Sequence, residues 1–155
     1  MRARAALGVA ATAALIAAGC GREAPPRPAA EPPTPGQRVC RPMYSPPMGF
    51  LPTGSMETDE GSYRGLRQSF EDGGGSALVL TAGVRGEFGE GAPAAGQVKL
   101  TTGQRADLLG GGTTWILIWD GTSPCSPQTI TGNGFTRARF LEILRAMEAL
   151  AGPEA

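Results

Sequence analysis

The segment from Thr113 to Trp119 most constrains the fold, because its apolar residues occupy both faces of an extended strand. Side chains alternate along a strand, so Trp115, Leu117 and Trp119 share one face. Ile116 and Ile118 share the other. A strand that is apolar on both faces belongs inside a sheet and not at its edge. We therefore expect this segment to be a central strand, with a helix covering one face of the sheet.

Shorter apolar segments on both sides of this strand predict the rest of an antiparallel sheet. Glycine-rich turns separate them, at 73–75, at Gly103 and at 110–112. Short apolar positions also occur at 48–51 and 63–70, whereas residues 84–96 are typical of a loop. Four of these segments are predicted strands: 77–82 (ALVLTA), 98–100, 105–109 and 128–131. Together with the central strand they predict a sheet of about five strands.

One helix is predicted after the last strand. Thr136 is a good N-cap, and Phe135 just before it can contact Phe140 in the first turn. Gly152 followed by Pro153 is a typical helix stop. The apolar residues recur at helical spacing and should pack on the sheet, which predicts an α+β domain. These residues are Phe140, Leu141, Leu144, Met147 and Leu150.

The first 19 residues are expected to be an export signal and not part of this domain. Arg2 and Arg4 precede an apolar run of 14 residues, 5–18, which is short of the roughly 20 needed to span a bilayer. Small residues at 17–19 then precede Cys20, as at a secretory cleavage site. A retained membrane anchor is the less favoured alternative, because the run is too short.

The sequence LIAAGC, ending at Cys20, resembles the lipobox of bacterial lipoproteins. That resemblance implies that Cys20 becomes the first residue of the mature chain and carries a diacylglyceryl group, often with a further acyl chain. More than one acyl chain is needed for stable attachment to a membrane. An ordinary signal peptide cut nearby would instead leave Cys20 as a plain thiol. The lipobox pattern prefers leucine at the position of Ala17, so the match is not complete.

The domain boundaries follow from composition. Residues 1–19 are the predicted signal peptide, and residues 20–38 form a lipidated cysteine and a disordered Pro-rich tether, since six prolines leave little to bury. Residues 39–152 form one modest α+β domain. Without the signal peptide the chain carries 12 basic and 14 acidic side chains, which is not the charge distribution of a nucleic-acid-binding protein.

The three cysteines are predicted to have two different roles. Once Cys20 is lipidated, Cys40 and Cys125 remain, and an exported compartment favours a disulfide between them. Two free or metal-binding thiols are the alternative, but the chain has no histidine to complete a zinc site. The lack of histidine also excludes Ser-His-Asp and Cys-His catalysis. We expect a structural disulfide, no metal site and no cofactor.

Two other groups of residues could bind metal ions, but a structural interpretation is favoured for each. Met43, Met48 and Met56 could bind Cu(I), but flexible methionines more often fill gaps in irregular packing. The acidic residues Glu57, Asp59 and Glu60 lack the spacing of a calcium loop and are expected to be solvated.

Five segments of the chain form a recognisable series: FLPTG, GQVKL, QRADLL, TTWILIWDG and GNGFTRARFLEILRAMEAL. Their order resembles that of an extracytoplasmic domain of unknown function that occurs in bacterial lipoproteins and sigma-factor regulators. The resemblance covers roughly residues 41–150, and its motifs are mostly structural. It implies an α+β sensing, carrier or accessory domain beside a membrane and supplies no catalytic residues.

The functional expectation is a non-enzymatic binding or accessory lipoprotein of the cell envelope. It would be anchored to the outer face of the cell membrane or to the outer membrane of a bacterium, with an envelope protein or a small hydrophobic ligand as partner. One alternative is a carrier of lipid or another hydrophobic ligand, with Phe70, Trp115 and Trp119 lining an apolar cavity. The second alternative is a histidine-free hydrolase that uses a concave cluster of carboxylates.

Overall fold

The computed structural model describes residues 37–86 and 89–151. The expected signal peptide, Cys20, most of the Pro-rich tether and the Gly152-Pro153 stop lie outside these residues. The described part of the chain forms one open sheet with a single helix, α1 (Arg137–Ala146), after the last strand. Within these residues, no helix is long and apolar enough to cross a membrane.

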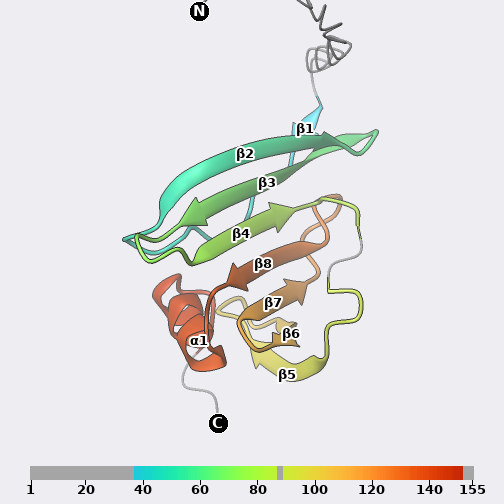
Figure 1. Cartoon of the computed structure of the whole chain (residues 1–155). Coiled ribbons are helices and arrows are strands. Elements are labelled where there is room, and N and C mark those ends of the chain that lie inside the picture. The colour runs from blue at the N-terminus through green and yellow to red at the C-terminus, as the bar shows by residue number, and fades with distance from the viewer. Residues whose placement is uncertain (1–36, 87–88, 152–155) are drawn as a thin grey trace, which may run out of the picture. The chain divides into compact units, whose positions relative to one another are not determined.

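The sheet has eight strands within the described residues, so the expectation of about five was wrong, and the fold is mostly β (Figure 1). Seven strands lie side by side in the order β1-β3-β4-β8-β7-β6-β5, and β2 also pairs with β3. The strands are β1 (Arg38–Val39), β2 (Leu51–Asp59), β3 (Tyr63–Glu71), β4 (Ala77–Ala82), β5 (Ala94–Lys99), β6 (Arg105–Gly111), β7 (Thr114–Trp119) and β8 (Gln128–Asn133).

The central position of β7 is confirmed, because it pairs antiparallel with β6 on one side and β8 on the other. Its side chains divide as the alternation predicts. Trp115, Leu117 and Trp119 are buried, whereas Ile116 and Ile118 are half-buried on the opposite face. Gly89, in the connection between β4 and β5, lies against Ile116 on that second face. Burial on both faces therefore comes from the helix on one side and a connecting loop on the other.

The helix begins as predicted and ends earlier than predicted. Thr136 is the N-cap, and its hydroxyl accepts a hydrogen bond of 3.3 Å from the main-chain N–H of Arg139. The helix ends at Ala146, before Met147 and Leu150, which are buried all the same. Leu150 instead forms an antiparallel bridge with Leu100 just after β5. The apolar residues therefore continue beyond the helix, because the segment that follows it also packs against the core.

The main core lies between the sheet and α1. Phe135 and Phe140 close one end of this core over Gly132 of β8, where a methyl group would come within 2.6 Å of the Phe140 ring. The absence of a side chain at Gly132 lets the first turn of α1 approach the sheet closely. The largest fully buried side chains of this core are Leu78, Leu80, Leu100, Leu108, Leu117, Ile130, Phe140 and Leu144.

The strands that the sequence did not predict lie at the edge of the sheet away from α1 (Figure 1). Almost every residue of β2 is exposed, so the strand has no apolar alternation that could reveal it. Its pairing with β3 runs over eight residue pairs and contains an irregularity between Pro52 and Gly54. Main-chain hydrogen bonding and not burial therefore holds β2 in place.

Candidate functional site

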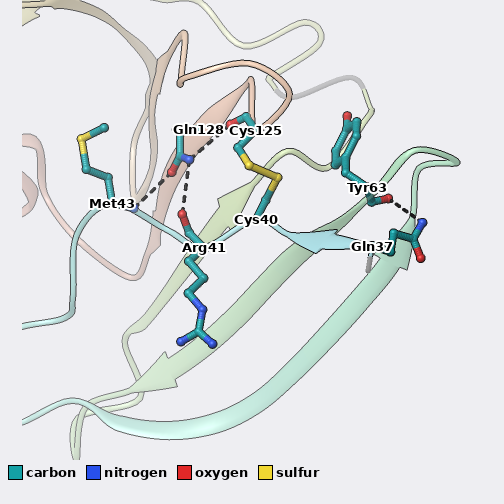
Figure 2. The surroundings of a disulfide bond; sticks show 7 residues. All are labelled: Gln37, Cys40, Arg41, Met43, Tyr63, Cys125 and Gln128. Carbon is teal, nitrogen blue, oxygen red and sulfur yellow. Dashed lines mark hydrogen bonds between the residues drawn. A yellow bond between two sulfur atoms is a disulfide. The ribbon is translucent and has the colours of Figure 1, made fainter. Parts of the chain in front are cut away.

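A disulfide fixes the start of the domain to the connection between β7 and β8. Cys40 and Cys125 are bonded, with their Cα atoms 5.3 Å apart and a sequence separation of 85 (Figure 2). This is the pair that the cysteine count predicted. Both residues are buried and share a small cluster with Tyr63 and Ala82, separate from the main core. The bond therefore fastens a second region that the helix does not cover.

Gln128 holds the residues that follow Cys40. Its side-chain oxygen accepts a hydrogen bond of 3.2 Å from the main-chain N–H of Met43. Its side-chain nitrogen donates to the main-chain oxygens of Cys125 at 3.2 Å and of Arg41 at 3.4 Å (Figure 2). Gln128 is 4% exposed, so these bonds satisfy a buried amide and fix the main chain at 41–43.

Residues 41–50, here called the covering segment, continue along the core. The Tyr44 ring lies 5.7 Å from the Trp119 ring, and its hydroxyl is 3.3 Å from the Thr101 hydroxyl. At the other end of the segment, the Phe50 ring lies 6.2 Å from the Phe135 ring. Aromatic pairs at these spacings are attractive. The segment is thus fastened at both ends and in the middle, although it contains no helix or strand.

A groove of about 330 Å³ lies between the covering segment and β3. Three alternate residues of β3, Leu66, Gln68 and Phe70, form one wall, because alternate side chains share a face. This volume falls at the lower end of the range for small-molecule sites. The groove is the candidate functional site. Its other wall is formed by Arg41, Pro42, Tyr44, Ser45 and Pro46.

Two further hollows flank this site. One, of about 310 Å³, lies beside the disulfide and includes Arg38 and Arg41. The other, of about 400 Å³, lies on the opposite face of β2 and β3, around Met56 and Arg67. Arg41 lines both the groove and the hollow beside the disulfide, and is the cation placed between them.

The three aromatic residues expected at a hydrophobic ligand do not share one role. Trp115 is buried, and its indole N–H donates a hydrogen bond of 3.0 Å to the main-chain oxygen of Phe135. Trp119 is also buried, and its indole nitrogen has no hydrogen-bond partner among the described residues. Both belong to the main core, whereas Phe70 also lines the groove.

The acidic residues of β2 and the following turn are held by neighbouring groups. Glu57 forms an ion pair of 3.0 Å with Arg64, and Glu60 lies 3.8 Å from Arg85. Asp59 accepts a hydrogen bond of 2.8 Å from the main-chain N–H of Gly61, which lowers the pKa of that carboxyl together with a weaker effect of Gln37. In the ranges 37–86 and 89–151, no group of three or more acidic or cysteine side chains is placed to hold a metal ion.

The expectation that the methionines fill packing gaps was wrong. Met43 and Met56 are exposed, and Met48 is fully exposed. With Leu51, they are the large exposed hydrophobic side chains of the described chain, and all four fall within residues 43–56. The covering segment and the start of β2 therefore present an apolar outer surface.

The sequence did not single out Arg41, Gln68 or Gln128. Nothing in the local pattern distinguishes a buried glutamine such as Gln128 from a solvated one, because its partners at 41 and 43 lie more than 80 residues away. The chain matches no protein family, no curated protein and no solved structure.

Proposed function

We propose that this protein is an exported bacterial lipoprotein, attached to a membrane through Cys20, whose domain is a non-enzymatic binding or accessory module of the cell envelope. The observation that carries the proposal is the pairing of Cys40 with Cys125. This pairing uses two of the three cysteines and leaves Cys20, the residue that follows an apolar run and three small residues. The lipobox resemblance then gives that remaining cysteine a role.

The disulfide also supports the proposed location. Disulfides persist in oxidising compartments such as the periplasm and the cell surface and are rare in the bacterial cytosol. The Pro-rich residues after Cys20 would serve as the tether between the lipid and the domain, which begins at β1.

The groove supports binding as the role of the domain. Its two walls combine half-buried apolar side chains, among them Leu66 and Tyr44, with polar groups and one charged residue, Arg41. In a binding site, polar groups fix the orientation of a ligand and apolar side chains supply buried area. The disulfide and Gln128 hold one wall rigidly against the sheet, which lowers the entropy lost on binding.

The lipid anchor is tested by metabolic labelling with an alkyne-bearing fatty acid in a bacterial host. The wild-type protein should carry the label and fractionate with membranes. Cys20→Ser should lose the label and the cleavage before residue 20. A Cys40→Ser, Cys125→Ser double variant is the control and should keep the label. A wild-type protein that is secreted without label, or a labelled Cys20→Ser variant, would overturn the proposal.

A further inference from the structure

We propose that the groove between residues 41–46 and β3 binds the free C-terminal end of a partner polypeptide whose last residue is apolar. This inference rests on the proposed binding role of the domain but not on the lipid anchor. It names the class of partner and gives Arg41, the apolar side chains and Gln68 of the groove each a part in recognition.

Arg41 supplies the charge that a C-terminal carboxylate requires. It is the one charged residue in the lining of the groove, and its guanidinium forms no ion pair with any residue that the structure describes. Gln128 fixes its main chain, and Figure 2 shows its side chain directed away from Gln128 and the disulfide. An arginine fork matches a carboxylate with two parallel hydrogen bonds. The groove therefore favours an anion.

The nearest acid in the strand register does not oppose that charge. Glu57 of β2 pairs directly with Leu66 of β3, so the two side chains lie on the same face as the groove. Arg64 neutralises Glu57 through the ion pair of 3.0 Å. Glu57 is thus compensated by its own partner, and Arg41 remains available for a ligand.

The apolar side chains of the two walls fit the side chain of a final residue. Leu66 is half-buried and Phe70 is almost fully buried, and Tyr44 faces the groove from the covering segment. Pro42 and Pro46 in the opposite wall have little conformational freedom left to lose. An apolar side chain placed here would bury area from water on both walls.

Gln68 selects a peptide over a simple fatty acid. It lies on β3 between Leu66 and Phe70 on the same face, and its side chain makes no hydrogen bond to another described residue. A side-chain amide both donates and accepts, which matches the N–H and C=O of a peptide group. A hydrocarbon chain would leave this amide unpaired, at a cost to affinity.

The test uses the full-length protein, purified in the form in which the bacterial host produces it, and the peptide acetyl-Gly-Ala-Ala-Phe. One form has a free carboxylate and the other a C-terminal amide, and binding is followed by ligand-observed NMR. The free acid should bind saturably, and the amide about tenfold more weakly, because a charge-assisted hydrogen-bond pair is lost. A third arm uses decanoate as a carboxylate without peptide groups.

Arg67→Gln is the matched control for Arg41→Gln. Arg67 is an exposed arginine on β3 that lines the hollow on the opposite face. Arg41→Gln should weaken the free acid about tenfold and leave the amide unchanged, whereas Arg67→Gln should change neither by more than about twofold. Thermal unfolding of both variants checks that they fold. Gln68→Leu should weaken the acid and the amide alike, which a loss of charge would not do.

The position of the peptide is tested with benzoylphenylalanine as its last residue. Photocrosslinks should map to residues 41–46 and 63–71. Equal binding of acid and amide, an Arg41→Gln variant that binds like wild type, crosslinks elsewhere or binding of decanoate in place of the peptide would each overturn the inference. Such results would not affect the labelling test of Cys20, and a failure of that test would not affect these measurements.

Discussion

The indole N–H of Trp115 donates a hydrogen bond of 3.0 Å to the main-chain oxygen of Phe135. This bond connects the centre of the sheet to the residue just before the N-cap of α1. The neighbouring indole on the same face, that of Trp119, is equally buried but has no such partner within the described residues. The two tryptophans of β7 therefore fill the same core and differ in one polar contact.

Replacing each tryptophan with phenylalanine should separate packing from hydrogen bonding. Both changes remove a similar volume, but Trp115→Phe also leaves the Phe135 oxygen without its donor. We expect Trp115→Phe to lower the free energy of unfolding by about 1 kcal/mol more than Trp119→Phe. Urea denaturation measures the difference. Equal losses would show that the Phe135 contact contributes nothing to stability.

A methyl group at Gly132 should destabilise the contact between the sheet and α1. The added carbon would lie 2.6 Å from the Phe140 ring and 2.9 Å from the Phe135 ring. Overpacking of this kind costs about 1–3 kcal/mol. Gly54→Ala in β2 is the control, since nothing lies within 4 Å of the place that its methyl group would take, and it should change the stability by less than about 0.5 kcal/mol. A neutral Gly132→Ala would contradict the close approach of α1.

The disulfide should be a large contributor to stability. Cys40 and Cys125 close a loop with a sequence separation of 85, for which loss of chain entropy in the unfolded state gives about 4.5 kcal/mol. We expect the Cys40→Ser, Cys125→Ser double variant to lose up to this amount in denaturant unfolding. A reducing agent should destabilise the wild type but not the double variant. A reductant-insensitive wild type would show that the two thiols are not bonded.

The stability that Asp72 contributes in the turn between β3 and β4 should depend on pH. The Asp72 carboxylate accepts hydrogen bonds from the main-chain N–H groups of Ser76 and Gly74, both at 2.9 Å, and the Ser76 bond contributes most to lowering its pKa from 3.8. A pKa that is lower in the folded state gives stability above the unfolded pKa. That stability is lost as the pH falls through the folded value.

Asp72→Ala should therefore be less stable than wild type near neutral pH, and the gap should close as the pH drops below the lowered pKa. Denaturant unfolding from about pH 6 to about pH 2 measures this gap. A gap that stays constant over the whole range would show that the charge of Asp72 does not contribute.

The sequence predicts the parts of the fold whose burial is periodic. β7 alternates clearly, and α1 has a cap at Thr136 and an apolar stripe, so both are confirmed, although the end of α1 was placed too late. β2 was missed because its residues are exposed on both faces and main-chain pairing with β3 defines it. Local periodicity cannot report a strand that buries no side chains.

The candidate site depends on contacts between distant parts of the chain, and this limits what sequence can reveal. The pairing of Cys40 with Cys125 follows from counting cysteines together with the prediction that Cys20 is lipidated. The groove does not follow, because Arg41 and Gln68 become neighbours of one cavity only through the path of the covering segment. That path depends on Gln128 and on the ring contact of Tyr44 with Trp119.

The lipid anchor at Cys20, on which the proposed location depends, can be decided by mass spectrometry of the N-terminal peptide of the protein purified from bacterial membranes. We expect the mature chain to begin at Cys20 and this residue to carry a diacylglyceryl group on its sulfur. A mature chain that begins at another residue, or a Cys20 peptide with an unmodified thiol, would contradict the proposal.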